Sequence, residues 1–296
     1  MSQKALQWFA ITAGCILAYV GMRSLPVEPC NFLHYGEFVN AEGVIEGCGY
    51  EETEFFDMQA LRFPILVKMT PQETPRTGEP VTFDLSIQTT SGRPISYHDI
   101  AVTHTERLHL LLVDPTLQDY QHIHPQPAGP PGHYTFTMTP QGAGEYRAYF
   151  DFIPLTNSRR TLLHSRFEVE GQPKDSVESA KVAHQWQDWE FKLHFKTGTP
   201  RVNEEFEMEL LVSDSDRRPK FEPVMGAFAH LVAFDAEGRG FSHLHPLNPF
   251  LDEQDPFNPE MNFRMRLDRP GHYRIWAQIK VEGEELYLPF DLHIAS

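Results

Sequence analysis

Apolar and polar positions alternate with a period of two along much of the chain after residue 22, and no stretch there shows a long 3.6-residue period. The alternation is clearest in residues 81–87, 134–138 and 206–212, each of which is bounded by turn residues. Gly- and Pro-containing turns separate such segments at intervals of roughly ten residues. Short strands at this spacing are typical of β-sandwiches. The pattern therefore predicts an all-β fold for the bulk of the protein.

An internal repeat over about 100 residues divides this region into two. Residues 108–125 (LHLLLVDPTLQDYQHIHP) match residues 229–246 (AHLVAFDAEGRGFSHLHP), and a Gly-x-Tyr-Arg frame follows each copy, beginning at Gly144 and Gly271. Because several motifs recur in the same order, we expect two tandem sandwiches of one topology. The predicted organisation is an anchor at 1–23, an irregular acidic tether at 24–60, a first repeat at 61–170, a linker at 171–188 and a second repeat at 189–296.

The long apolar segment at the N-terminus, residues 5–22, carries no charge and lies between Lys4 and Arg23. Eighteen residues of helix span about 27 Å, just short of a typical ~30 Å hydrocarbon core. Three interpretations compete: an uncleaved single-pass transmembrane helix, a cleaved signal peptide, and a lipoprotein signal ending at Cys15. Residues 22–24 make a poor cleavage site, and the apolar run continues for seven residues past Cys15. We favour the uncleaved anchor, with residues 5–22 in the lipid bilayer.

Two cysteines lie just after this segment, and they bear on the compartment. The charges that flank the apolar run are nearly balanced, so they do not set the orientation. Cys30 and Cys48 would pair in an oxidising compartment, although two unrelated free thiols are the alternative. We expect a single-pass inner-membrane protein with a Cys30–Cys48 disulfide and most of the chain in the periplasm.

Charge and motif content exclude several classes of function. The formal net charge is −16, from 25 basic and 41 acidic residues, and no cluster of Lys and Arg exists that would bind nucleic acid. The sequence lacks a Gly-x-Ser-x-Gly elbow, a phosphate-binding Gly-rich loop, a dinucleotide fingerprint and a His-Glu-x-x-His helix. We therefore expect neither a nucleic-acid partner nor enzymatic activity.

Histidines at identical spacing in the two repeats are the candidate chemistry. If strands near 107–114 and 120–125 pair around a turn, His109 falls opposite His124, and His122 lies one diagonal step away on the same face. The same arithmetic holds for the second copy, which carries His230, His243 and His245. Imidazole ligands suit Zn, Cu and Ni, and three histidines with one open position form a known metal arrangement.

A structural role is the competing interpretation of these histidines. The residues that flank these histidines, among them Leu110 and Leu231, are apolar on both faces of the predicted strands. Such surroundings suit rings that are buried and hydrogen-bonded to the backbone. Duplication preserves a packing motif as well as a metal site. We favour the structural role, in which each ring bonds a different group, and we expect both repeats to agree. The histidines without a repeat partner, among them His104, are interpreted as isolated surface or core residues.

The His-Leu, Asp, His-x-His-Pro and Gly-x-Tyr-Arg pattern resembles the YtkA-like and cupredoxin-like exported β-sandwich domains of bacteria. This resemblance covers both repeats and implies immunoglobulin-like or cupredoxin-like Greek-key sandwiches; some members are thought to handle copper. A blue-copper centre needs a Cys ligand, and all three cysteines lie at or before Cys48, so neither repeat can build one. The two copies also disagree at a further position, where Asp151 aligns with Gln278.

Two functions follow from these features. We favour a non-catalytic, membrane-anchored periplasmic protein without a cofactor, acting as an accessory or scaffolding subunit of an inner-membrane complex of respiratory or photosynthetic type. Its partners would then be integral-membrane subunits. The alternative is a periplasmic protein that binds copper or zinc through the two sets of three histidines.

Overall fold

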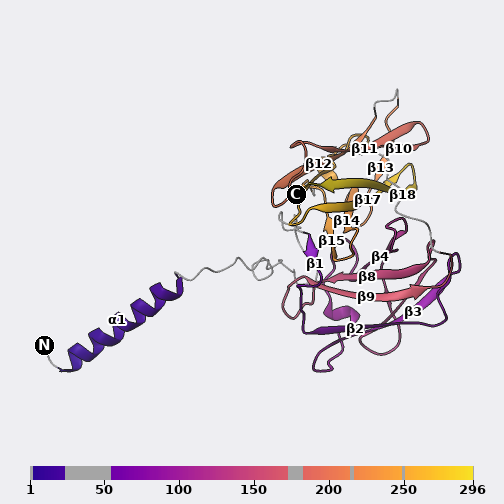
Figure 1. The fold of residues 1–296 in the computed structure, drawn as a ribbon. Helices are drawn as coiled ribbons and strands as arrows, with labels where there is room; N and C mark the ends of the chain where they lie inside the picture. Colours follow the sequence, from indigo (N-terminus) through magenta and orange to yellow (C-terminus); the bar gives the residue numbers. More distant parts are fainter. Residues whose placement is uncertain (1–2, 24–54, 173–182, 214–216, 249–250, 296) are drawn as a thin grey trace. The chain divides into compact units, whose positions relative to one another are not determined.

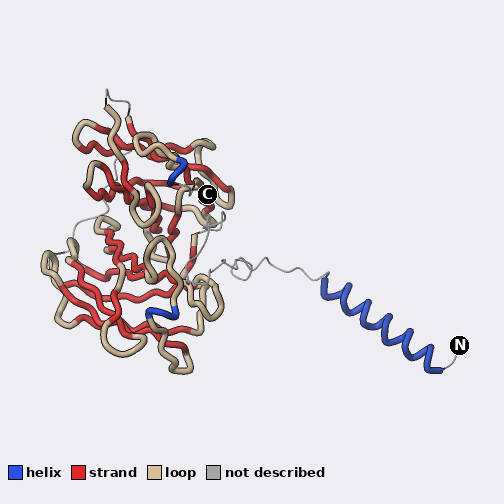
Figure 2. The backbone as a smooth tube through the Cα atoms, turned by 180° about the vertical axis from the view of Figure 1, so that it is seen from behind, coloured by secondary structure: helices blue, strands red, loops and turns tan. Residues whose placement is uncertain are grey.

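The computed structural model describes residues 3–23, 55–172, 183–213, 217–248 and 251–295. The chain divides into two compact units, Met1–Gly36 and Glu37–Ser296. In the first unit, the described residues form helix α1 (Gln3–Arg23). The second unit contains both repeats and, within its described residues, consists of strands, loops and two short 3-10 helices, Tyr97–Asp99 and Leu251–Glu253 (Figure 2).

Repeat 1 is a sandwich of two four-stranded antiparallel sheets (Figure 1). One sheet has the order β2-β3-β7-β6 and the other has the order β5-β4-β8-β9. Apolar residues of both sheets form one core. The strands are β2 (Ile65–Pro71), β3 (Val81–Thr89), β4 (His109–Val113), β5 (Tyr120–Ile123), β6 (Gln126–Pro127), β7 (His133–Met138), β8 (Gly144–Phe152) and β9 (Thr161–Val169).

Repeat 2 is also a sandwich of two antiparallel sheets, one with four strands and one with six. One sheet has the order β10-β11-β12-β16, and the other contains β15-β14-β17 with β18 paired to β17. The order β15-β14-β17-β18 matches β5-β4-β8-β9 of repeat 1 strand for strand. The strands are β10 (Ala183–Trp186), β11 (Trp189–Phe195), β12 (Glu205–Val212), β13 (Phe221–Glu222), β14 (Ala229–Asp235), β15 (Gly240–Leu244), β16 (Asn262–Arg266), β17 (Gly271–Val281) and β18 (Glu284–Ile294).

The alternation in the sequence produces these sheets directly. In β3, Val81, Phe83, Leu85 and Ile87 are buried in the core, while the intervening residues are wholly or partly exposed. A strand that packs on one face only is expected to show this pattern. The predicted all-β fold of two tandem sandwiches behind one N-terminal helix is confirmed.

The central strands β4 and β14 differ from this pattern, because every residue in them is buried. In β4, Leu110 and Leu112 face the core of repeat 1, and in β14 the residues Leu231 and Ala233 face the core of repeat 2. The opposite faces of these strands are also buried, because the two repeats pack against each other there. This second buried face carries His109 and His230.

The expected boundaries differ from the structure at two places. Residues 24–60 were predicted to be an irregular tether, but β1 (Phe56–Asp57) pairs with β15 and extends a sheet of repeat 2. Phe55 packs edge-on against Tyr273, at a centroid distance of 5.3 Å. Likewise β10 lies within residues 171–188, which were predicted to be a linker, and it pairs with β11 as an edge strand. Short edge strands of this kind carry little alternation, so the sequence pattern did not show them.

Candidate functional site

In repeat 1, the hairpin of β4 and β5 brings three histidines together. Leu110 lies opposite Ile123 in the hydrogen-bonded register. This register places His109 beside His124 at the open end of the hairpin, with His122 one diagonal step away. The ring centroids of the three histidines lie 4.9–5.3 Å apart. The register expected from the sequence is thus the observed one.

Repeat 2 builds the same cluster from β14 and β15. Leu231 lies opposite Leu244, so His230 lies beside His245 and His243 is on the diagonal. The ring centroids are 4.7–5.7 Å apart. The two hairpins therefore agree in register, as the duplication predicts. We call the two clusters triad 1 (His109, His122, His124) and triad 2 (His230, His243, His245).

The first histidine of each triad is oriented by a backbone carbonyl. The Nε2 atom of His109 donates to the carbonyl of Thr103 at 3.0 Å, and Nε2 of His230 donates to the carbonyl of Val224 at 2.9 Å. A carbonyl accepts only, so Nε2 carries the proton in both rings. The Nδ1 atom of each ring therefore keeps its lone pair, and Nδ1 of His230 has no hydrogen-bond partner among the described residues.

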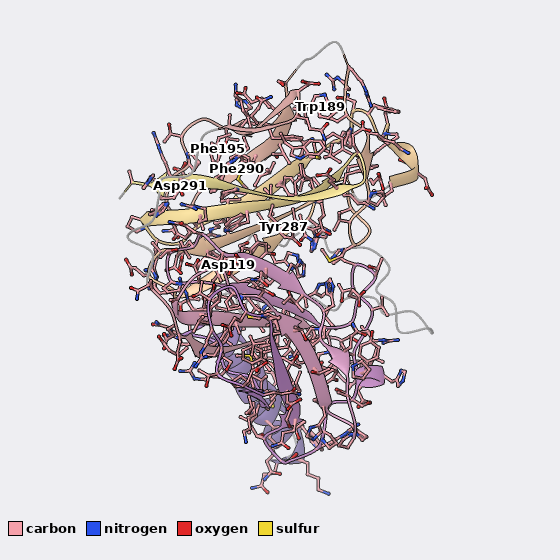
Figure 3. All side chains as sticks on the ribbon, turned by 90° about the vertical axis from the view of Figure 1, so that its right-hand side faces the viewer. Asp119, Trp189, Phe195, Tyr287, Phe290 and Asp291 are labelled. Atoms are coloured by element: carbon pink, nitrogen blue, oxygen red, sulfur yellow. The ribbon has the colours of Figure 1, made fainter. Side chains whose placement is uncertain are left out.

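The second histidine of triad 1 is oriented by a side chain of repeat 2. The Nδ1 atom of His122 lies 3.0 Å from Oε1 of Gln278. The amide nitrogen of Gln278 donates to the carboxylate of Glu285 at 2.5 Å and to the hydroxyl of Tyr287 at 3.0 Å, which fixes the amide oxygen toward His122. Tyr287, labelled in Figure 3, also lies 5.8 Å from Tyr120 of repeat 1, centroid to centroid. His122 therefore donates from Nδ1 and keeps its lone pair on Nε2.

The second histidine of triad 2 is oriented in the same way by repeat 1. The Nδ1 atom of His243 lies 3.4 Å from Oδ2 of Asp151, a carboxylate that also binds Arg160 through two contacts of 2.9 and 2.5 Å. Burial opposes ionisation of Asp151, but the charge and hydrogen bonds of Arg160 prevail and lower its pKa. With Nδ1 donating, His243 keeps its lone pair on Nε2. That atom is buried and has no hydrogen-bond partner among the described residues.

The ring nitrogens of each triad lie close together. One ring nitrogen from each histidine lies within 4.8 Å of the other two in both triads. In triad 1, Nδ1 of His109 is 3.1 Å from Nε2 of His122, although both atoms are acceptors in the tautomers set by their other partners. Two acceptors at this distance repel unless a cation lies between them. Tetrahedral zinc with bonds near 2.0–2.1 Å would hold its ligand nitrogens about 3.3 Å apart, which matches the observed separation.

The rings are neutral at pH 7. Burial lowers the pKa of His109 and of His230 to about 4. Burial, with the neighbouring histidines adding to it, also holds the pKa values of His122, His243 and His245 well below the usual range. Neutral imidazole is the form that binds a metal ion.

The two triads adjoin each other between the repeats. The rings of His122 and His243 have centroids 5.4 Å apart, and those of His109 and His243 are 5.9 Å apart. These separations are close to those within a triad. Beside triad 2, a small cavity of about 10 Å³ has the size that one water molecule needs. It is lined by residues of both repeats, among them His109, His245, Asp151 and Arg160.

Equivalent residues of the two repeats exchange contacts across this interface. Tyr120 of repeat 1 contacts Trp276 at 5.8 Å, and their counterparts, Phe241 and Tyr149, are 4.8 Å apart. The contacts of His122 and His243 with the opposite repeat follow the same rule. Such reciprocity is the property of a two-fold symmetric interface, here formed within one chain.

The structural and metal interpretations of the histidines each account for some of the ring nitrogens. One nitrogen of four rings bonds a fixed partner, as the structural role predicts. Those four partners are all different groups, and in addition one ring nitrogen of each histidine lies close to the other two of its triad in both repeats. Cys30 and Cys48, predicted to form a disulfide, lie outside the described residues.

Three residues of the site were missed or set aside in the sequence. His104 was interpreted as isolated, but its ring stacks on His245 with a centroid distance of 3.6 Å. It lies in a two-residue turn with a positive φ of 51°, and Met225, with φ 47°, holds the equivalent position in repeat 2. Asp151 and Gln278 were set aside because the copies disagree there. Their role depends on contacts between repeats, which strand alternation does not reveal.

Comparisons with known proteins place the repeats in a family and add little else. A family model described as a domain of unknown function (DUF8832) matches the chain twice, over residues 65–170 and 184–296. A search of curated proteins finds no significant match.

Two solved structures illustrate the structural likeness. A protein from Corynebacterium diphtheriae described as membrane anchored is 7% identical, with a TM-score of 0.24, over 78% of this chain and 59% of that one. The fibronectin(III)-like modules of CbhA from Clostridium thermocellum are 12% identical, with a TM-score of 0.19, over 77% of this chain and 94% of that one. This chain thus spans less than two thirds of the Corynebacterium protein. At these TM-scores neither likeness carries an argument about function.

Proposed function

The chain belongs to the DUF8832 family, in two copies, and from that premise we propose that it is a membrane-anchored protein that binds copper or zinc, one ion at each histidine triad. The observation that supports the proposal is that three histidine ring nitrogens lie close together in each buried triad. Each triad brings one ring nitrogen from each of three neutral imidazoles together, and the opposite ring nitrogens of His109, His122, His230 and His243 face fixed acceptors.

This pattern fits metal binding better than packing. Histidines that bind metal usually donate their other ring N–H to a carboxylate, a carbonyl or an equivalent group, which fixes the tautomer and the ring direction. Here two backbone carbonyls, one amide oxygen and one carboxylate supply these contacts. A purely structural cluster would leave buried acceptors such as Nδ1 of His230 and Nε2 of His243 without a hydrogen, at a cost of about 1–3 kcal/mol each.

The ligand set narrows the choice of metal. All candidate ligands are imidazoles, which suit zinc and copper, and Cu²⁺ binds a given nitrogen site more tightly than Zn²⁺. The hard cations Mg²⁺ and Ca²⁺ prefer oxygen ligands, and neither triad offers one. Three ligands per ion leave a coordination position for water or another small ligand.

The test is a metal analysis of the full chain, purified in mild detergent, loaded with Cu²⁺ or Zn²⁺ and desalted. We expect two bound ions, one for each triad. His122→Asn and His243→Asn should each remove one ion. His133→Asn is the matched control, because His133 is exposed on β7 of repeat 1 and belongs to neither triad. Retention of no metal by the wild-type chain would refute the proposal.

Membrane attachment is proposed for helix α1. The helix is long and apolar enough to cross a bilayer, and large side chains such as Trp8, Phe9 and Leu17 are 70–72% exposed in the described chain. Exposed apolar side chains on every side of a helix suit a lipid environment. A signal sequence meets the same criterion of length and apolarity. If α1 is an anchor, alkaline carbonate washing leaves the protein in the membrane pellet; if it is a cleaved signal, the protein appears in the supernatant with a shorter N-terminus.

Periplasmic placement and an accessory role in a membrane complex stay predictions from the sequence, as does the absence of catalysis. They are compatible with metal binding, because a subunit of a complex can also hold metal. Protease added to spheroplasts should digest the repeats if they face the periplasm. Purification in mild detergent should bring integral-membrane subunits with the chain if it is an accessory subunit, and the isolated chain otherwise.

A further inference from the structure

We infer that the two triads form one dinuclear metal centre with unequal positions, and that Asp151 and Gln278 are the positioning residues that make them unequal. In this centre triad 2 binds its ion more tightly and fills first. The inference rests on the proposed function, because it concerns the same two sites.

The closeness of the triads makes the centre dinuclear. The rings of His122 and His243, from different triads, are 5.4 Å apart, and the rings of His230 and His243, from the same triad, are 5.7 Å apart. The two ions would therefore share one buried space. Two cations so close repel each other, so the second ion binds more weakly than the first unless a small anion lies between them. The water-sized cavity lined by His109 and His243 provides room for hydroxide or another ligand of that size.

Each position depends on the opposite repeat for its orientation. His122 of triad 1 donates to Gln278 in repeat 2, and His243 of triad 2 donates to Asp151 in repeat 1. Asp151 and Gln278 occupy equivalent places: Asp151 lies opposite His109 on the neighbouring strand, and Gln278 lies opposite His230. The two repeats therefore carry a polar side chain at the same position of the strand, but it is a carboxylate in repeat 1 and an amide in repeat 2.

That change makes the two triads unequal. A carboxylate that accepts from Nδ1–H raises the basicity of Nε2 more than a neutral amide does, and loss of such a contact typically lowers metal affinity 10- to 100-fold. Neighbouring side chains fix the orientation of both groups. Arg160 donates to both carboxylate oxygens of Asp151, at 2.9 and 2.5 Å, while Glu285 and Tyr287 hold the amide of Gln278 with its oxygen toward His122.

The surroundings add to the difference. His104 of repeat 1 stacks on His245 and lies 5.8 Å from His230, so triad 2 has an additional ring against it. Met225 holds the equivalent turn position in repeat 2. Triad 2 is therefore the more enclosed of the two positions as well as the one with the carboxylate.

The test is a Cu²⁺ titration of the full chain, monitored by calorimetry and by electron paramagnetic resonance. We expect two resolved binding steps. The first gives the signal of an isolated ion, and the second broadens that signal through magnetic coupling. Asp151→Asn should weaken the first step by 10- to 100-fold. Gln278→Glu, combined with Glu285→Gln so that an amide donates to the new carboxylate, should strengthen the second. All three substitutions preserve side-chain size, and unfolding of each metal-free variant measures whether the fold is intact.

Single-triad variants assign the steps. In a His122→Asn background, which leaves triad 2 complete, Asp151→Asn should still weaken binding. In a His243→Asn background its effect should be much smaller, because Asp151 then no longer accepts from a metal ligand, whereas Gln278→Glu with Glu285→Gln should strengthen binding. Equal affinities that neither substitution changes, or two ions without magnetic coupling, would overturn this inference while leaving the proposed function standing. Absence of copper binding would overturn this inference, and absence of both copper and zinc binding would overturn the proposed function as well.

Discussion

Repeat 1 and repeat 2 share one fold and one set of histidines, and they differ in the residues that contact those histidines where the repeats meet. The sheets that carry the histidine hairpins share the strand order β5-β4-β8-β9 and β15-β14-β17-β18, and the two hairpins have the same register. At the shared interface, however, Asp151 stands where repeat 2 has Gln278, and His104 stands where it has Met225. The six histidines occupy equivalent positions in the two repeats, while two of the residues that contact them differ. The comparison teaches that a duplicated site need not consist of two identical copies.

Metal binding should produce the largest difference between states of the protein. A ligand at 1,000 times its dissociation constant stabilises the folded state by about 4 kcal/mol per site, so two ions should add roughly twice that. We expect thermal unfolding of the full chain in detergent to move to higher temperature with Cu²⁺ or Zn²⁺ and to return with a chelator.

His109→Asn and His230→Asn should each remove the contribution of one site to that metal-dependent gain, with the larger loss for His230→Asn because triad 2 binds its ion more tightly. The two variants are matched because the residues occupy equivalent positions in the two triads. A shift that survives both substitutions together would place the metal elsewhere.

The cores offer a matched pair of substitutions. Leu110 and Leu231 hold equivalent positions and are both completely buried. Truncation to Ala leaves a cavity, which typically costs 2–5 kcal/mol for a buried leucine. We expect Leu110→Ala and Leu231→Ala to lower the free energy of unfolding by similar amounts in urea titrations. A large effect in one repeat and a negligible one in the other would contradict the equivalence of the cores.

Acid should destabilise the metal-free protein through the buried histidines. The pKa values of His109 and His230 are about 4 in the folded state, against about 6.5 in an unfolded chain. The unfolded state therefore binds more protons between these values, so stability is complete above pH 6.5 and declines as the pH falls toward 4. Each group contributes at most about 3 kcal/mol to this decline.

Unfolding measured with chelator across this range checks the sign. His109→Asn or His230→Asn should make the dependence on pH shallower. A stability that rises on acidification would mean that the rings are charged in the folded state.

The smallest expected effect lies in the two turns that supply the carbonyls of Thr103 and Val224. Thr105 has a φ of 71°, and Gly226 has a φ of 77° at the equivalent position. An L-residue in this left-handed region costs roughly 1–2 kcal/mol. A side chain at Gly226 would enter open space, so the backbone conformation alone determines how a substitution there changes stability.

Thr105→Gly should therefore stabilise repeat 1 slightly, and Gly226→Thr should destabilise repeat 2 by about that amount. Differential scanning calorimetry of the two variants measures both changes. Equal and negligible shifts would show that the turns tolerate either residue.

The sequence predicts the parts of this structure that depend on local pattern. Period-two alternation gives the strands, and the repeat gives two sandwiches of one topology. A fixed spacing between His109 and His124 around one turn gives the hairpin register. These features follow from backbone geometry within short segments, so they do not need knowledge of the tertiary structure.

The remaining features of the site depend on contacts between distant segments. Asp151 reaches His243 across 92 residues, and Gln278 reaches His122 across 156. Burial of β4 on both faces indicates that something packs there, yet it does not identify the other repeat as the partner. In the sequence, the presence of Asp151 in one copy and Gln278 in the other argues against a metal ligand common to both repeats. In the structure, these two residues contact the histidines and make the two triads different.

Anomalous X-ray diffraction from crystals of the copper-loaded chain tests the central claim most directly. We predict two copper peaks between the repeats, one bonded to a nitrogen of each histidine of triad 1 and the other to a nitrogen of each histidine of triad 2, at distances near 2.0–2.1 Å. Copper peaks only at surface histidines, with the two triads free of metal, would contradict the account.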